Sequence, residues 1–177
     1  MTRAEIPQEQ RPAGRARVRL VAAGLFSAAF AWSGLDSWAQ DHAFLINTTA
    51  SLPDWAFFVD RARLPARGDL IFFVPPPSAL LRAHFGPCPI PFGKIVYGVA
   101  GDTVTRRGRM FFVAGRLVAT AKPVSRRGEQ LAVGPTGTIP RGCYFVATPH
   151  PDSFDSRYAA IGWVCRPQVI GSGVPIL

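Results

Sequence analysis

The chain of 177 residues carries a formal net charge of +9, and its length suits one domain with a short appendage, so no second catalytic domain is expected. Its 17 prolines, 17 glycines and 48% hydrophobic residues exclude a disordered polymer and a helical bundle and favour a mainly β fold. The arginines are divided between the N-terminal tail and scattered loops such as 106–107 and 126–127, so the charge favours proximity to an anionic membrane over nucleic-acid binding.

A membrane-targeting segment is predicted at the N-terminus. An apolar run over 20–35 follows five arginines: Arg3, Arg11, Arg15, Arg17 and Arg19. As a helix this run reaches ~24 Å, less than a hydrocarbon core of ~30 Å, so residues 37–39 are expected to extend the span. We therefore predict a basic cytoplasmic tail over 1–19, a transmembrane anchor over 20–39 and a periplasmic domain over 40–177, with single-pass topology in a bacterial inner membrane. Because 37–39 has small residues at the two positions that a leader peptidase recognises, a secretory signal is the alternative.

Apolar runs bounded by turn residues predict the strands of the outer domain. Two of them, 110–113 and 116–119, are separated by Ala114 and Gly115 and form a predicted two-residue hairpin. The segment 75–91 is predicted to be a loop with one helical turn at 78–83, and 124–139 is turn-rich. The other predicted strands are 55–59, 70–74, 94–99, 143–148 and 160–165.

Three cysteines, Cys88, Cys143 and Cys165, leave at least one thiol unpaired in an oxidising compartment. One disulfide is possible, and the spacing does not assign it. The cysteines lack the spacing of metal ligands, and no histidine cluster accompanies them. The sequence therefore predicts neither a metal site nor a cofactor.

A serine and a lysine form the candidate catalytic pair. Ser51 lies in NTTASLP (47–53), just before a predicted strand, and Lys94 begins KIVYGVAGD (94–102). A serine hydroxyl is a poor nucleophile until a base removes its proton, and a lysine is such a base only when it is neutral near the working pH. Because free lysine titrates near ~10.4, Lys94 must be desolvated, which its apolar neighbours favour.

Two further segments, GDLIFF (68–73) and PDSFDSRY (151–158), complete an ordered set of four with the serine and lysine segments. This order resembles the signal peptidase I family of membrane-anchored serine peptidases, and within it the short conjugative-transfer branch typified by TraF. The compact length, the proline run 75–77 and the GPCP segment 86–89 also resemble that branch. The sequence departs from the usual family pattern at three non-catalytic positions: Leu52, Ile95 and Ala100.

The resemblance implies a signal-peptidase-like β fold and specific catalytic roles. Ser51 would be the nucleophile and Lys94 the general base. The hydroxyl of Thr49 and the backbone N–H of Ser51 would form the oxyanion hole, where such donors are worth roughly 3 kcal/mol each. The competing interpretation of Thr49 is an ordinary turn threonine.

The last of the four segments is expected to support the site. The resemblance implies that Ser153 hydrogen-bonds and orients the lysine amine, and that Asp155 and Arg157 form an ion pair that braces the active-site region. An exposed pair, the competing interpretation, would contribute under about 1 kcal/mol. The Gly-Asp pairs at 68–69 and 101–102 are predicted to be structural turns. The three histidines, His42, His84 and His150, are isolated in the sequence, which disfavours a Ser/His triad.

The predicted function is that of a membrane-anchored serine endopeptidase that cleaves a secreted precursor, with a conjugative pilin as the leading substrate. Capture of the acyl-enzyme by an amine would join pilin ends into a ring, and the residues do not decide between hydrolysis and cyclisation. The alternative is a catalytically silent, membrane-anchored assembly protein of a conjugation or secretion apparatus. A self-cleaving repressor-type Ser/Lys protease is disfavoured, because the chain shows no DNA-binding module. The expected partners are the precursor protein and the inner membrane, not nucleic acid.

Overall fold

The computed structural model describes residues 13–49 and 51–177. The chain divides into two compact units, Met1–Gln40 and Asp41–Leu177. The boundary lies one residue beyond the predicted end of the anchor at residue 39.

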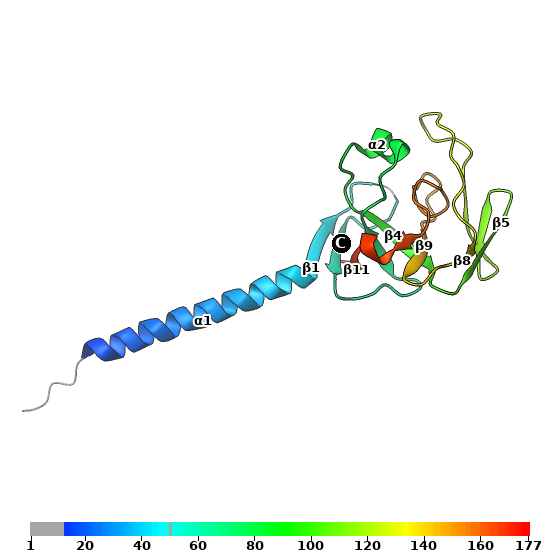
Figure 1. The fold of residues 1–177 in the computed structure, drawn as a ribbon. Helices are drawn as coiled ribbons and strands as arrows, with labels where there is room; N and C mark the ends of the chain where they lie inside the picture. Colours follow the sequence, from blue (N-terminus) through cyan, green and yellow to red (C-terminus); the bar gives the residue numbers. More distant parts are fainter. Residues whose placement is uncertain (1–12, 50) are drawn as a thin grey trace, which may run out of the picture. The chain divides into compact units, whose positions relative to one another are not determined.

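The N-terminal unit contains one long helix, α1 (Ala13–Asp41) (Figure 1). Its stretch Val18–Asp41 has 24 residues and a mean hydropathy of 1.5, and none of it is buried against protein. At about 1.5 Å per residue this stretch is ~36 Å long, which exceeds a hydrocarbon core of ~30 Å. The predicted apolar helix is present, but it begins within the predicted basic tail and continues past residue 39. Arg3 and Arg11 lie outside the described residues.

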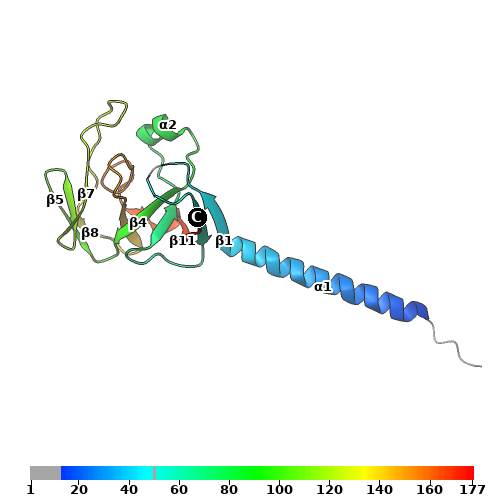
Figure 2. The same cartoon turned by 180° about the vertical axis from the view of Figure 1, so that it is seen from behind.

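The second unit is built on a seven-stranded antiparallel sheet (Figure 1, and from behind in Figure 2). The strand order is β1-β2-β11-β3-β4-β9-β10. The strands are β1 (His42–Ile46), β2 (Ala56–Asp60), β3 (Leu70–Phe73), β4 (Phe92–Gly98), β9 (Cys143–Ala147), β10 (Val164–Cys165) and β11 (Val169–Pro175). The mainly β prediction is confirmed, because four of these strands overlap the predicted strands closely.

A smaller antiparallel sheet has the order β7-β6-β5-β8. Its strands are β5 (Thr103–Arg107), β6 (Met110–Val113), β7 (Arg116–Thr120) and β8 (Gly137–Thr138). The predicted hairpin is β6–β7, and its turn residues Ala114 and Gly115 both have positive φ, 47° and 78°. A tight hairpin turn of this kind matches the twist of the flanking strands, and glycine adopts it without strain.

Two short helices complete the unit. Helix α2 (Ala79–Phe85) begins at Ser78, whose hydroxyl accepts a hydrogen bond from the Leu81 N–H at 3.0 Å. With seven residues, α2 is longer than the single helical turn predicted at 78–83. A 3₁₀ helix, η1 (Arg166–Gln168), leads from β10 into β11.

Four strands, β1, β5, β8 and β11, were not predicted, and the predicted strand 160–165 is reduced to two residues. The omission of β11 has a clear physical reason, because its sequence VIGSGVP contains two glycines and a proline, which are poor strand formers. A Cβ on Gly173 would lie 2.4 Å from a ring carbon of Phe72. The absence of a side chain at this position lets β11 fit between β2 and β3.

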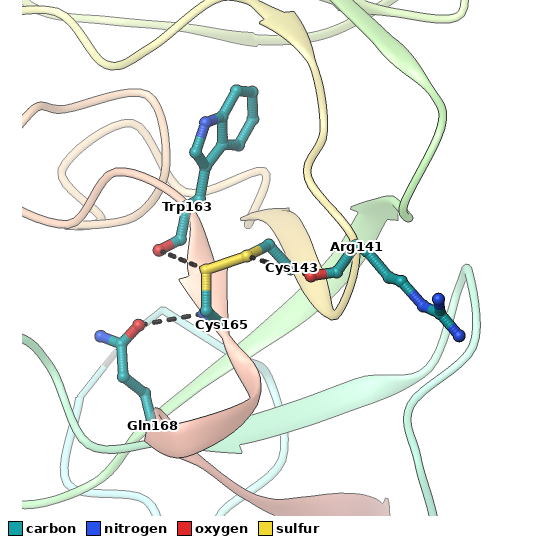
Figure 3. Close-up of a disulfide and its surroundings, with 5 residues drawn as sticks. All are labelled: Arg141, Cys143, Trp163, Cys165 and Gln168. Atoms are coloured by element: carbon teal, nitrogen blue, oxygen red, sulfur yellow. Dashed lines mark hydrogen bonds between the residues drawn. A yellow bond between two sulfur atoms is a disulfide. The ribbon is translucent and has the colours of Figure 1, made fainter.

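One disulfide joins Cys143 of β9 to Cys165 of β10, a directly paired position in the antiparallel register (Figure 3). The Cys165 N–H donates a hydrogen bond to the side-chain oxygen of Gln168 at 3.0 Å. Cys88 is free and exposed. The structure therefore assigns the pairing that the spacing left open.

Candidate active site

Ser51 lies in the loop that connects β1 to β2, and this loop is closed at its base. The Asn47 N–H donates a hydrogen bond to the Trp55 carbonyl at 2.8 Å. The Asn47 side-chain amide nitrogen donates to the carbonyl oxygens of Leu52 at 3.1 Å and Asp54 at 2.9 Å. The side chain of a single residue thus ties together the two sides of the serine loop.

Lys94 lies on β4, a central strand between β3 and β9. The buried positions of β4 alternate, and Lys94 shares the buried face with Phe92 and Val96. Residue 94 is 5% exposed. A lysine at a buried strand position is rare, because its charge loses hydration there.

The serine and the lysine, 43 residues apart in sequence, are in contact. Lys94 Nζ lies 3.3 Å from Ser51 Oγ, at hydrogen-bond distance. Burial lowers the pKa of Lys94 from its ordinary 10.5 to about 8, while the Asp155 charge opposes this shift and the Arg157 charge adds to it. A substantial fraction of Lys94 is therefore neutral in mildly alkaline solution, as a general base requires.

Asp155 and Arg157 form a buried, two-pronged ion pair. Arg157 Nε lies 2.7 Å from Asp155 Oδ1, and Arg157 Nη2 lies 2.8 Å from Oδ2. The two residues are 0% and 2% exposed, so the exposed-pair interpretation is wrong. Arg157 Nη2 also donates to the Thr148 carbonyl at 2.6 Å. The pair therefore ties the C-terminal motif to the chain just after β9, next to the strand of Lys94.

Ser153 does not make the expected contact with the lysine in this structure. Its residue is 4% exposed, and its hydroxyl has no hydrogen-bond partner among the described residues. The hydroxyl of Thr148 is also buried without a partner. The Ser153 N–H bonds to the His150 carbonyl at 3.3 Å, which holds the backbone while the hydroxyl makes no bond.

Thr49 lies beside the candidate nucleophile. Its Oγ1 is 2.9 Å from Ser51 Oγ and 3.1 Å from Asn47 Oδ1, and its N–H donates to the same Asn47 oxygen at 3.0 Å. Thr49 was predicted at this place from the motif, whereas Asn47 was not predicted. Asparagine side chains often hydrogen-bond to nearby backbone groups. An asparagine four residues before the serine could therefore have predicted that its side chain holds the serine loop.

Gly93, directly before the lysine, was also missed. A Cβ at this position would lie 2.8 Å from a ring carbon of Phe72 and 3.0 Å from Leu52 Cδ1. Leu52 and Phe72 are 6% and 4% exposed and pack in one core cluster with Phe57 and Val59. The missing side chain of Gly93 lets Leu52, and with it the loop of Ser51, lie close against β4.

The serine and lysine open into a pocket of about 740 Å³. Its apolar lining residues include Leu45, Ile46, Phe85, Ile90 and Phe92. Its charged lining residues include Lys122, Arg126 and Asp152, and both cations form ion pairs with the carboxylate. The lining of the pocket thus combines apolar and charged side chains.

Two of the three histidines, isolated in the sequence, line this pocket as well. His84 Nε2 lies 3.1 Å from Glu129 Oε2, and His150 Nδ1 accepts the N–H of Asp152 at 3.2 Å. Within the described ranges the hydrogen-bond partners of Ser51 Oγ are Lys94 and Thr49. The partner of the serine is therefore the lysine rather than a histidine.

The two Gly-Asp pairs are turns, as predicted. Gly68 and Gly101 have φ of 90° and 91°. Asp69 accepts the Ala66 N–H at 3.0 Å, and Asp102 accepts the Val99 N–H at 2.7 Å. Over residues 13–49 and 51–177, no group of three or more histidine, cysteine or acidic side chains is arranged to hold a metal ion.

The second unit is a β domain in which a buried lysine is hydrogen-bonded to a serine at a pocket. In the sequence it follows an apolar helix able to span a membrane. These are the features of the membrane-anchored serine/lysine peptidase class. The chain belongs to the signal peptidase family: the family model described as "Signal peptidase, peptidase S26" matches residues 18–177.

Two relatives of the chain are described as conjugal transfer proteins. The chain is 30% identical over 131 residues to the conjugal transfer protein TraF of Agrobacterium fabrum, a match that covers 65% of this chain and 72% of that protein. It is 31% identical over 158 residues to the probable conjugal transfer protein TraF of Sinorhizobium fredii, covering 82% and 78%. A signal peptidase I from Enterococcus faecalis V583 is 25% identical, with a TM-score of 0.39, and covers 62% of this chain and 97% of that one. The resemblance to the TraF branch of the family is confirmed.

Proposed function

We propose that this protein is a serine endopeptidase in which Ser51 is the nucleophile and Lys94 the general base. The observation that carries the proposal is the contact of 3.3 Å between Ser51 Oγ and a lysine that is 5% exposed. Burial lowers the pKa of Lys94 to about 8. Burial of the Lys94 amine costs hydration free energy, and the amine faces a serine hydroxyl in an open pocket. A buried ionisable group with a shifted pKa in a pocket is typical of a functional site rather than of a structural lysine.

The proposed chemistry uses the side chains of this site in order. Lys94 Nζ takes the proton of Ser51 as Oγ attacks the carbonyl carbon of the substrate peptide bond. The Thr49 hydroxyl and the Ser51 N–H donate to the oxygen on which negative charge develops. Lys94 then returns the proton to the leaving amine, the carbon–nitrogen bond breaks, and a water activated by Lys94 releases the acyl group from Ser51.

The Asp155–Arg157 pair and Ser153 have supporting roles in this proposal. The buried pair braces the segment that carries Ser153, which lines the same pocket as Lys94. The unbonded Ser153 hydroxyl then accepts a hydrogen bond from the lysine ammonium after rotation about its side-chain torsion. This bond would hold the amine in line with Ser51 during proton transfer.

We further propose that the substrate is a secreted precursor and that the protein acts from the outer face of the inner membrane. Two named relatives are conjugal transfer proteins, which makes a conjugative pilin precursor the first substrate to test. The Cys143–Cys165 disulfide is typical of an oxidising compartment such as the periplasm. An amine that captures the acyl group instead of water would produce a cyclic product from the same acyl-enzyme.

The test is co-expression of the full-length protein with a candidate pilin precursor, followed by intact-mass measurement of the precursor. Wild type, Ser51→Ala and Lys94→Ala are compared, with thermal melting of each variant as the folding control. Processing in the wild type alone supports the peptidase, and an additional loss of one water shows cyclisation. A well-folded Ser51→Ala variant that still processes the precursor overturns the proposal, and a wild type that processes neither this precursor nor a synthetic Ala-x-Ala signal peptide favours the silent assembly role.

A further inference from the structure

We infer that Asn47 is a positioning residue that holds the hydroxyl of Thr49 in place as the oxyanion donor. The inference rests on the proposed function, because it assigns a role within that reaction. Asn47 lies directly after β1, four residues before Ser51, and its backbone N–H closes the serine loop onto Trp55. Its side chain contacts Thr49 on one side of Ser51 and the carbonyls of Leu52 and Asp54 on the other.

The orientation of the Asn47 amide follows from its partners. Two carbonyl oxygens, those of Leu52 and Asp54, lie 3.1 and 2.9 Å from one end of the amide. A carbonyl oxygen only accepts, so this end is the NH₂ group and the opposite end is the oxygen. Oδ1 therefore faces Thr49, where it accepts the backbone N–H at 3.0 Å and the hydroxyl at 3.1 Å.

The protons in this cluster then have one consistent arrangement. Thr49 has a single hydroxyl proton, and because Oδ1 of Asn47 only accepts, that proton points to Asn47. In the contact of 2.9 Å between Thr49 and Ser51, the serine hydroxyl is therefore the donor. The Lys94 ammonium donates to Ser51 Oγ at 3.3 Å. Hydrogen bonds thus run in one direction from Lys94 through Ser51 and Thr49 to Asn47.

This arrangement describes the resting enzyme with a protonated lysine, and deprotonation changes it. When Lys94 is neutral, the Ser51 proton turns toward Nζ, and the Thr49 oxygen no longer receives it. The Thr49 hydroxyl can then rotate its proton from Asn47 to the developing oxyanion. The second contact, from the Thr49 N–H to the same Asn47 oxygen, keeps the threonine in place while its hydroxyl rotates. Asn47 thus positions the donor without touching the substrate.

A double-mutant cycle separates this role from a general brace of the loop. The detergent-solubilised full-length protein is assayed on a synthetic signal peptide with an Ala-x-Ala cleavage site, as wild type, Asn47→Ala, Thr49→Val and the double variant. We expect Thr49→Val to lower kcat by about 10²-fold and Asn47→Ala by at least about 10-fold, each with little change in KM, because an oxyanion exists only in the transition state. The double variant should be within about threefold of Thr49→Val alone. Thr105→Val, on an exposed position of β5, is the control for loss of a threonine hydroxyl.

Three outcomes overturn the inference while the peptidase itself stands: full activity in Asn47→Ala, a loss that appears in KM alone, and a double-variant loss equal to the product of the two single losses. A structural measurement keeps the inference testable even without activity. In a crystal structure of the full-length Asn47→Ala variant, we expect the Thr49 Oγ1–Ser51 Oγ distance to exceed ~3.5 Å, the limit of a hydrogen bond. A distance unchanged from the present 2.9 Å overturns the inference, whereas wild-type activity no higher than that of Ser51→Ala overturns only the proposed function.

Discussion

Lys94 Nζ lies 3.3 Å from Ser51 Oγ although the two residues are 43 positions apart and lie on separate elements, the strand β4 and the β1–β2 loop. Among the described residues this contact is the only side-chain hydrogen bond of the lysine, which is 5% exposed. The pair has the proximity and the electrostatic environment that proton transfer requires.

The first prediction concerns the pH dependence of activity. Because burial lowers the pKa of Lys94 to about 8, the neutral form increases as pH rises, and kcat/KM for peptide cleavage should rise with a midpoint near pH 8 and level off at higher pH. Lys94→Arg should lose at least about 10³-fold in kcat at every pH, because a guanidinium does not act as a base in proteins. A pH–rate profile of the full-length protein measures both. A profile that is flat from pH 6 to 10 would contradict the role of Lys94.

The second prediction concerns the pH dependence of stability. In the unfolded chain Lys94 titrates near 10.5, and in the folded chain near 8, so between these values the unfolded state binds more protons. The contribution of Lys94 to the free energy of unfolding should therefore rise from about pH 8 to about pH 10.5, and be least favourable below pH 8. Lys94→Met should stabilise the protein below pH 8 by up to about 3 kcal/mol and remove this slope. Chemical unfolding of both proteins across this pH range measures the difference.

The third prediction concerns the buried ion pair. Asp155→Asn leaves the Arg157 guanidinium buried without its counter-charge, which should cost about 3–5 kcal/mol of unfolding free energy. The Asp155 charge also raises the pKa of Lys94, so the variant should shift the activity profile to lower pH. Asp152→Asn is the control for stability, because its partners Lys122 and Arg126 are partly exposed and such pairs contribute at most ~1 kcal/mol. Equal losses in the two variants would show that the buried pair is not special.

The fourth prediction concerns Gly93. An added methyl group would lie 2.8 Å from Phe72 and 3.0 Å from Leu52, so Gly93→Ala must displace one of these side chains. Overpacking of this kind costs about 1–3 kcal/mol of unfolding free energy. Because Leu52 adjoins Ser51, we expect kcat to fall more than KM rises. Gly34→Ala, in α1 where an added methyl group has nothing within 4 Å and φ is not positive, is the control for replacement of a glycine by alanine. A Gly93→Ala variant with wild-type kcat would show that the loop position tolerates the change.

The fifth prediction concerns the disulfide. Cys143 and Cys165 are separated by 22 residues, and closing a loop of that size stabilises a protein by about 3 kcal/mol. The double variant Cys143→Ser/Cys165→Ser should lose about that much free energy of unfolding. Cys88→Ser, at an exposed free cysteine, should unfold like the wild type. Urea unfolding under oxidising and reducing conditions checks the result, since reducing agent should affect only proteins with the intact bridge.

Local patterns in the sequence were sufficient for several features. The long apolar run predicted α1, and the Ala114–Gly115 turn predicted the β6–β7 hairpin, because helix hydropathy and tight-turn geometry depend on neighbouring residues. The order of the motifs also identified the residues that the structure brings together. Ser51, Thr49 and Lys94 were named from the sequence, and their contacts have hydrogen-bond distances.

Only the tertiary structure decided which distant segments meet. The glycine-rich β11 pairs with β2 and β3, and Gly173 lies in both pairings. Glycine is needed there because the ring of Phe72 leaves no room for a side chain, although glycine is a poor strand former. Likewise, the burial that lowers the pKa of Lys94 comes from elements that surround β4 in space, and a sequence shows the lysine but not its solvation. The sequence by itself therefore determined the chemical groups of the site and the long apolar N-terminal helix. Packing between residues far apart in the chain determined the disulfide pairing, the contacts of Gly93, and the environment in which the lysine can lose its proton.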